Sequence, residues 1–255
     1  MLVSVLASGS KGNCTLIKTN YNNILIDAGT TLRYINEKLK ENGIMLKDIN
    51  YILISHTHSD HVSALKSIIN KYKPIIILSK LMYDDLDFLK DYPNIIFLTD
   101  LIDTGDFTVE NIKTSHDTTD SRGYIITSGP SSLVQITDTG YLNQKYFSKL
   151  KNKNLYIMES NHNIEMLMHG KYPKWLKNRV ASDVGHLSNE SSSFYLSNLI
   201  GPNTKKIILA HLSEENNTPD LALKTLEKEL KEKNITFTDY EVAKQNEKTE
   251  LVEVW

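Results

Sequence analysis

The sequence predicts one α/β domain, and three observations lead to that prediction. The chain has 255 residues, of which 40% are hydrophobic, and this is enough to fill one large core. Short apolar runs with strand character alternate with helical patterns along the whole length. No internal repeat and no low-complexity linker divides the sequence. We therefore expect residues 1–255 to form a single domain.

In the first part of the chain, apolar runs end at glycines or polar turns. The start of the sequence is an apolar strand that leads into a Ser/Gly loop, and the second strand stops before Gly29. The first helical pattern stops before Gly43, as helices often do. The predicted strands here cover residues 2–7, 23–28 and 51–55, and the predicted helices cover residues 31–42 and 60–71.

The remainder of the chain continues the alternation. Residues 128–131 (SGPS) are typical of a hairpin turn between two strands. The last long helix is expected over residues 218–233, with Pro219 in its first turn, and a terminal strand pair is expected at 236–241 and 250–255. The other predicted strands cover residues 74–79, 95–98, 107–115, 123–128, 132–137, 155–159 and 207–210.

The amino-acid composition restricts which partners the protein could bind and which cellular compartment it could occupy. The formal net charge of −2 is ordinary for a globular protein, so any contact with nucleic acid should be local. The single cysteine, Cys14, fits a reducing compartment. The N-terminal residues do not resemble a signal peptide, and no apolar run approaches the roughly 18 residues that span a bilayer. We expect a cytoplasmic protein with no membrane partner, and the sequence leaves the oligomeric state open.

The segment HTHSDH, directly after the strand predicted at 51–55, is the strongest functional signal. It places four potential metal ligands within six residues, namely His56, His58, Asp60 and His61. Imidazole and carboxylate groups suit zinc, manganese or iron, and the junction of a strand and a helix lets them surround one point. A polar turn or a helix cap would account for one such histidine but hardly for this cluster.

Three further candidate ligands each follow the end of an apolar run. They are His116, Asp138 and His211. Taken singly, Asp138 could begin a turn with Gly140, and His116 could cap a loop. If the strands lie side by side, however, their ends converge on the first cluster. Together the three residues supply the remaining ligands of a site for two metal ions.

This set of residues resembles that of the metallo-β-lactamase superfamily across nearly the whole chain. The resemblance implies a four-layer αββα sandwich with two divalent metal ions, zinc or manganese or else iron, at one edge between the sheets. The first implied ligand set is His56, His58, His116 and Asp138. The second is Asp60, His61, His211 and again Asp138, whose carboxylate would bridge the two ions.

Three segments resemble one group of this superfamily more closely. They are ASGSKGN (7–13), SDVGHLSNE (182–190) and AHLSEENNTP (210–219). These segments are similar to those of the YycJ/WalJ group, which is related to ribonuclease Z, ribonuclease J and the cyclic phosphodiesterases. The resemblance implies a 5′-to-3′ exonuclease with nucleic acid as its substrate, DNA rather than RNA.

Such a site would hydrolyse a phosphodiester with a hydroxide that bridges the two metal ions, so no protein nucleophile is needed. Asp60, as a metal ligand, and His186, as the proton donor to the leaving oxygen, are the predicted catalytic residues. Asp27 is a candidate for orienting a ligand histidine, although it could equally be a residue that ends a strand.

Substrate contacts are expected from two loops and from His186. Glycines in residues 8–13 let backbone N–H groups approach a phosphate, with Ser8, Ser10 and Asn13 as further donors. Asn161 follows another strand and can face the same site. Residues 171–179 combine four cations with two aromatic rings, a mixture that can hold a single strand. For that stretch we favour an amphipathic surface segment with its tryptophan in the core.

Two other functional classes remain open from the residues alone. The same metal site could attack a small cyclic diester, or the carbonyl of a lactone or thioester, because the ligand set does not separate these reactions. A regulatory protein that keeps the fold without catalysis is the alternative of another class. The intact ligand set argues against it, since buried ligands without a metal would be unpaired polar groups.

Overall fold

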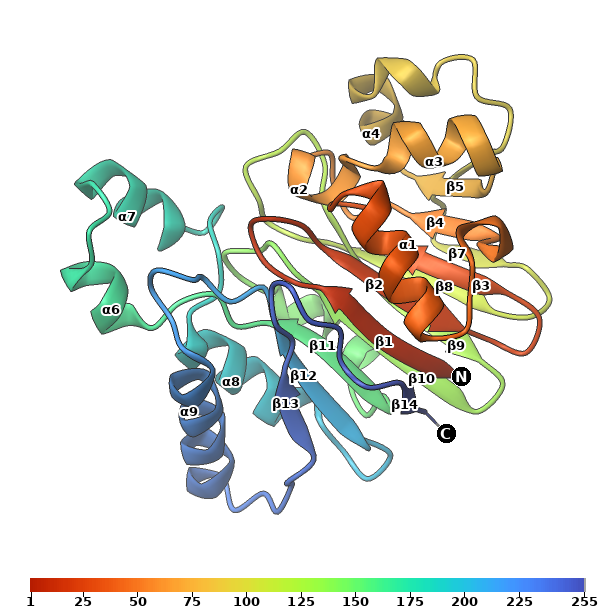
Figure 1. Ribbon diagram of the computed structural model, residues 1–255. Helices are drawn as coiled ribbons and strands as arrows, with labels where there is room; N and C mark the ends of the chain where they lie inside the picture. Colours follow the sequence, from red (N-terminus) through yellow and green to blue (C-terminus); the bar gives the residue numbers. More distant parts are fainter. Residues whose placement is uncertain (255) are drawn as a thin grey trace.

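Two β-sheets packed face to face form the centre of the molecule, and helices cover the outer face of each. The structure is a computed structural model and describes residues 1–254. Within those residues each sheet has seven strands. Figure 1 shows α1, α3 and α4 on the side of the first sheet, and α8 and α9 on the side of the second. The predicted four-layer αββα sandwich is therefore confirmed.

The first sheet contains the first six strands and the last one. Its order is β14-β1-β2-β3-β4-β5-β6, with antiparallel pairing from β14 to β3 and parallel pairing from β3 to β6. The bounds are β1 (Leu2–Ala7), β2 (Cys14–Lys18), β3 (Asn23–Ile26), β4 (Tyr51–Leu53), β5 (Ile75–Leu78), β6 (Ile95–Phe97) and β14 (Val252–Glu253).

The second sheet is built from the remaining strands in an almost sequential order. That order is β13-β12-β11-β10-β9-β8-β7, antiparallel from β7 to β10 and parallel from β10 to β13. The bounds are β7 (Leu101–Asp103), β8 (Thr108–Lys113), β9 (Arg122–Ser128), β10 (Ser131–Ile136), β11 (Leu155–Glu159), β12 (Lys206–Ala210) and β13 (Tyr240–Val242).

Helices occupy the connections between strands. The α-helices are α1 (Leu32–Glu41), α2 (Ser59–Val62), α3 (Leu65–Tyr72), α4 (Lys80–Asp85), α5 (Phe147–Leu150), α6 (Ile164–His169), α7 (Lys174–Val180), α8 (Asn189–Leu199) and α9 (Pro219–Glu232). The 3-10 helices are η1 (Leu46–Asp48), η2 (Asp87–Leu89) and η3 (Gln144–Tyr146). Across residues 1–254, no helix is both long enough and apolar enough to cross a membrane.

The alternation of side chains along the strands builds three apolar layers. In β1, Val3 and Val5 point between the sheets, whereas Leu6 joins the outer layer with Ile35 and Leu39 of α1. A third apolar layer packs the second sheet against α8 and α9. Each fully buried aliphatic side chain contributes about 1.5–3 kcal/mol relative to its exposed state, so these layers hold the sheets in register.

Several predicted elements differ from the structure at their ends. The strand predicted at 23–28 stops at Ile26, because Asp27 has a φ of 62° that a strand does not accommodate. The helix predicted at 60–71 is two helices, α2 and α3, separated at residues 63–64. The elements that were not predicted from the sequence include β2, β7, α4, α5 and α6.

Two expectations about the chain's surface and its terminal strands are wrong. β13 and β14 do not pair with each other: β13 lies beside β12 in the second sheet and β14 beside β1 in the first. Residue 255, the end of the predicted terminal strand, lies outside the described residues. Trp175, expected in the core, lies on α7 with 66% of its surface exposed.

Candidate metal centre

The predicted ligands follow the ends of strands in both sheets. His56 and His58 come after β4, and the short helix α2 carries Asp60 and His61. From the second sheet, His116, Asp138 and His211 follow β8, β10 and β12. Both sheets therefore contribute side chains to one end of the sandwich, as the sequence pattern predicts.

The backbone turns sharply where three acidic or histidine side chains meet this centre. Asp27, Asp138 and His211 have φ angles of 62°, 55° and 56°. Residues other than glycine seldom adopt this left-handed conformation, and each instance costs on the order of 1–3 kcal/mol. These turns come at or just after the ends of β3, β10 and β12, next to the centre.

Gly29 allows the HTHSDH segment to pack tightly against the end of β3. An added Cβ at Gly29 would lie 1.6 Å from the carbonyl oxygen of Asp60. On either side, Asn13 N donates to Asp60 O at 2.8 Å and Ala28 N donates to His61 O at 2.8 Å. These backbone contacts fix α2 against the first sheet, and only glycine leaves room for them.

The ligand atoms gather in two groups that share a central carboxylate. One group consists of His56, His58 and His116, and the other of Asp60, His61 and His211, each with its ligand atoms within 4.8 Å of one another. Asp138 lies between the groups. Its Oδ2 is 3.2 Å from His61 Nε2, and its Oδ1 is 3.4 Å from His211 Nε2 and 3.9 Å from His116 Nε2.

Hydrogen bonds to the Nδ1 atoms of the candidate ligand histidines orient their imidazole rings from the side away from the metal site. His61 Nδ1 is 2.8 Å from Asp27 Oδ2, and His116 Nδ1 is 3.2 Å from the carbonyl oxygen of Gly185. The Ser55 hydroxyl lies near both His56 Nδ1 and His61 Nδ1, at 3.2 and 3.1 Å. Partners of this kind fix the tautomer that presents Nε2 to a metal. Asp27 thus occupies the orienting position considered for it.

Glu159 performs the same function for two histidines, and sequence reasoning gave it no role. It ends β11 and is fully buried. Its Oε1 is 2.7 Å from His186 Nδ1 and 3.0 Å from His211 Nδ1, and its Oε2 accepts hydrogen bonds from Thr139 N and Leu187 N. Both of its oxygens accept hydrogen bonds, so Glu159 supports the two histidines, although it also belongs with Asp138, His186 and His211 to a group that could hold a metal ion. The signal that could have found it is a carboxylate at the end of an apolar strand.

Three buried ligand atoms fit a metal because they have no hydrogen-bond partner within the described part of the chain. Among residues 1–254, His56 Nε2, Asp138 Oδ2 and His211 Nε2 are buried without a hydrogen-bond partner. A buried polar atom left in this state costs about 1–3 kcal/mol. All three point into the cluster, and two imidazoles with a carboxylate are suitable ligands for zinc or manganese. The residues present therefore match the metal chemistry that the fold implies.

The charges of the cluster also favour a cation. Burial would raise the pKa of the Asp138 carboxyl, but the imidazoles of His211 and His61 hold it well below its usual range. Burial would lower the pKa of His61, yet Asp27 and Asp138 raise it to about 10. Burial likewise opposes ionisation of Glu159, whereas His186 and His211 lower its pKa to about 2. Ionised carboxylates thus attract positive charge, and an ion that binds His61 displaces a proton.

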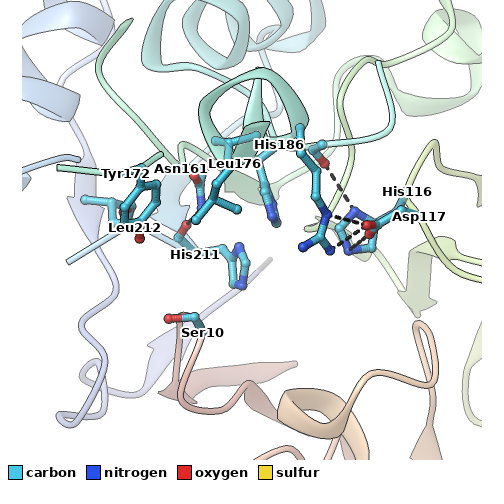
Figure 2. A pocket seen from close by; sticks show the side chains of 13 residues that line it. Ser10, His116, Asp117, Asn161, Tyr172, Leu176, His186, His211 and Leu212 are labelled. Carbon is cyan, nitrogen blue, oxygen red and sulfur yellow. Dashed lines mark hydrogen bonds and ion pairs between the residues drawn. The ribbon is translucent and has the colours of Figure 1, made fainter. Parts of the chain in front are cut away.

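A hollow of about 150 Å³ opens beside this centre. Figure 2 shows Ser10 on one side of it and Tyr172 and Leu176 on the other, with His211 between them. Asn161 and His186 also line the hollow, and Asn161 Nδ2 donates to the carbonyl oxygen of His211 at 2.9 Å. Three predicted substrate contacts, Ser10, Asn161 and His186, are therefore placed where a substrate could reach them.

Ser8 and Asn13, also expected to contact the substrate, lie behind the ligands and not in the hollow. Ser8 is buried, and its Oγ accepts a hydrogen bond from His211 N at 2.7 Å. Asn13 is buried as well, with its Nδ2 2.9 Å from His61 Nε2 and 3.4 Å from Asp60 Oδ2. Their contacts correspond to supporting the metal ligands, a role that a Gly/Ser-rich pattern does not distinguish from phosphate binding.

Comparison with known proteins places this geometry in a family. Residues 7–136 match the model of the metallo-beta-lactamase superfamily. The chain is 35% identical over 235 residues to exodeoxyribonuclease YycJ of Bacillus anthracis, covering 90% of this chain and 89% of the relative. It is also 35% identical over 234 residues to exodeoxyribonuclease WalJ of Streptococcus pneumoniae, covering 89% and 87%.

Solved structures share the fold at much lower sequence identity. The metallo-beta-lactamase fold protein YhfI of Bacillus subtilis superposes with a TM-score of 0.72 at 17% identity, over 97% of this chain and 98% of the other. The short form of human tRNase Z gives a TM-score of 0.67 at 14% identity, over 99% and 100%. These two likenesses concern the arrangement of the sheets and helices alone.

Proposed function

The chain belongs to the metallo-β-lactamase superfamily, and from this premise we propose that it is a metal-dependent phosphodiester hydrolase that removes nucleotides from the 5′ end of DNA. The observation that carries the proposal is the pair of ligand groups joined by Asp138 beside an open hollow. Relatives named as exodeoxyribonucleases, similar over nine tenths of the chain, favour a nucleic-acid diester over a lactone or thioester.

We assign the ligands to two adjacent sites on the basis of the grouping in the structure. His56, His58 and His116 would hold one ion and Asp60, His61 and His211 the other, with the Asp138 carboxylate shared between the two groups. When bound, two divalent ions of zinc, manganese or iron would supply a water molecule of lowered pKa and offset charge on the phosphoryl oxygens.

His186 is proposed to donate the proton that the leaving oxygen requires. It lines the hollow, and its Nδ1 is held by Glu159, which leaves Nε2 to meet a substrate. Glu159 is ionised and accepts from both His186 and His211, so one carboxylate positions the proton donor relative to a metal ligand. Asn161 and Ser10 then provide donors to the remaining phosphate oxygens at the wall of the hollow.

We further propose that residues 1–255 act as one catalytic domain in the cytoplasm. The apolar layer between the sheets takes side chains from both, and the ligands come from both. Cys14 is a buried free thiol, which suits a reducing compartment. DNA is the proposed substrate in preference to RNA, since both relatives carry the name exodeoxyribonuclease.

The test is hydrolysis of 5′-phosphorylated single-stranded DNA, labelled at either end, with Mn²⁺ or Zn²⁺ supplied. Wild-type protein should release nucleotides stepwise from the 5′ end. His58→Ala should lose both metal content and activity. The matched control is His169→Ala, which removes an exposed histidine outside the cluster and should keep its metal and its hydrolysis of bis-p-nitrophenyl phosphate.

Two other outcomes would redirect the proposal. If metal-loaded wild-type protein leaves DNA intact but cleaves RNA or a cyclic diester, the substrate is wrong and the metal centre remains. If it cleaves only thioesters or lactones, the reaction class itself is wrong, because attack then occurs at carbon and not at phosphorus.

A further inference from the structure

We propose that α6, α7 and the turn between them hold a single DNA strand as it enters the metal centre. This segment, residues 164–180, is called the α6–α7 arm below, and the inference rests on the proposed function. Figure 1 shows α6 and α7 at one side of the molecule, apart from the two sheets. A helical pair that does not cover a sheet is available to bind something else.

The base of the arm forms part of the wall of the catalytic hollow. Tyr172, Leu176, Arg179 and Val180 line it together with the histidines of the metal centre. Figure 2 shows Tyr172 and Leu176 opposite Ser10 across the hollow. A strand lying along the arm would therefore lead directly to the reacting end, with no intervening element to cross.

The arm is basic in a chain that is slightly acidic. It carries Lys171, Lys174, Lys177 and Arg179 against one acid, Glu165, whereas the whole chain has 29 Lys and Arg against 31 Asp and Glu. A local concentration of cations is what a nearly neutral protein needs in order to bind a polyanion. Charge complementarity thus selects a phosphate backbone as the occupant.

Two of these cations hold the arm in place and two remain available. Lys177 Nζ donates to the carbonyl oxygen of Met168 at 2.7 Å, and Arg179 forms an ion pair with Asp117 at 2.5 Å. Within the described residues 1–254, the ammonium groups of Lys171 and Lys174 form no hydrogen bond or ion pair. We assign these two ammonium groups to phosphates.

The exposed aromatic and apolar side chains on the arm indicate that its partner is a DNA strand with unpaired bases. Trp175 is 66% exposed, and Ile164 and Met168 on α6 are 43% and 47% exposed. Tryptophan is seldom so accessible in a protein without a partner for it. Base–aromatic stacking requires a base whose face is free, which single strands offer and duplexes conceal. The arm therefore fits single-stranded DNA better than a duplex.

Fluorescence anisotropy of a labelled strand binding to metal-loaded protein tests this assignment. A single strand of about 10 nucleotides with phosphorothioate linkages, which slow hydrolysis, matches the span of such sites. Trp175→Ala should raise Kd about tenfold through the loss of one stacked base. Lys171→Gln/Lys174→Gln should weaken binding and reduce the slope of log K against log salt by about 1.4, or 0.7 for each phosphate contact.

Matched controls separate the arm from general surface effects. Tyr21→Ala removes an aromatic side chain that is 84% exposed in the turn between β2 and β3. Lys66→Gln/Lys71→Gln makes the same change of charge on α3. Both controls should bind the strand as wild type does. Both controls should also hydrolyse bis-p-nitrophenyl phosphate at the wild-type rate, because neither change touches the hollow.

The possible outcomes distinguish the arm from the catalytic proposal. If the arm variants bind the strand as tightly as the controls, or if a blunt duplex competes as well as the single strand, the inference is overturned. Wild-type protein that cleaves the small diester but binds no DNA overturns it as well, while phosphodiester hydrolysis stands. If the protein binds the DNA strand in a manner that depends on Trp175 but hydrolyses no diester, the role of the arm is supported and the proposed function is wrong.

Discussion

Single side chains at this centre act mainly by holding other side chains. Glu159 accepts hydrogen bonds from two imidazoles and two backbone amides, and Asp27 and Ser55 hold the histidines of the HTHSDH segment. The clustering of the candidate ligands was predictable because they follow apolar runs in the sequence. The partners behind them were not, apart from Asp27, because their role depends on which strand ends converge in space.

Glu159→Gln should reduce kcat on bis-p-nitrophenyl phosphate about 10- to 100-fold, since partners of ligand and catalytic histidines contribute on that scale. The neutral amide keeps the size of the side chain but removes the negative charge that lies against His186 and His211. The acidic and basic limbs of the pH–rate profile should therefore move as well, which a purely structural change would not cause. Glu190→Gln, an exposed acid on α8, is the control and should leave kcat and the profile unchanged.

The reactivity of Cys14 can be used to measure unfolding, because its thiol is buried in the folded protein. Burial and the nearby Asp27 carboxylate raise the pKa of the Cys14 thiol well above its usual range. We expect iodoacetamide at pH 8 to modify the native protein at least about 100-fold more slowly than the urea-unfolded protein. Equal rates in the two states would show that the first sheet opens readily at β2.

The same thiol makes stability depend on alkaline pH. Its folded pKa is raised, so its contribution is fully present below the unfolded value of about 8.5 and is lost as the pH rises above it. The free energy of unfolding should fall by up to about 1.4 kcal/mol per pH unit from this group. Urea titrations at pH 8 and pH 10 should show a smaller fall for Cys14→Ala than for wild type.

At the scale of elements, the loop after β3 determines whether α2 can hold its ligands. Gly29→Ala would place a methyl group onto the backbone of Asp60, and backbone cannot move aside as a flexible side chain can. We expect a loss of about 3 kcal/mol or more in stability, with loss of bound metal, measured by urea unfolding and metal analysis.

Gly43→Ala provides the contrasting change. Gly43 has a φ of 72° with nothing within 4 Å of an added Cβ, so only the backbone conformation opposes alanine there. The expected cost is about 1 kcal/mol with metal content unchanged. Similar losses for both variants would argue that the close approach at Gly29 does not matter to the centre.

The elements themselves were largely predictable, and their limits and pairings were less so. Apolar periodicity found most strands, but it could not anticipate the positive φ of Asp27 that ends β3 early. β2 was missed because CTLIK has no regular alternation of polar and apolar residues, although it is central in its sheet. The supposed terminal pair failed because β13 and β14 join different sheets, a long-range choice that local patterns do not encode.

At the scale of the whole molecule, metal and fold should depend on each other. The proposed ligands come from both sheets, and His56, Asp138 and His211 have buried atoms that a metal would satisfy. Chelation by EDTA should therefore lower the thermal midpoint. At about 1,000 times Kd, restored metal should stabilise the protein by about 4 kcal/mol. His58→Ala should show a markedly smaller shift, and an equal shift in both proteins would place the stabilising ion elsewhere.

The overall architecture followed from the family resemblance more than from composition, which predicted only an α/β domain. Neither could place the α6–α7 arm. An amphipathic segment with a tryptophan usually packs that side chain inward, and nothing in residues 171–179 indicates that the sheets are already covered by other helices. Trp175 is exposed because of the way the whole molecule is assembled, and no local sequence pattern predicts this.

Because both sheets contribute side chains to the centre, the protein could become active only late in its synthesis. A growing chain exposes the HTHSDH segment early, but His211 is added only as residue 211 of 255, and β12, which places it, needs β11 beside it. We expect ribosome-bound chains that stop before this point to be inert toward nucleic acid. If the proposed ligands are correct, their order along the sequence keeps the second metal site incomplete until His211 has been added.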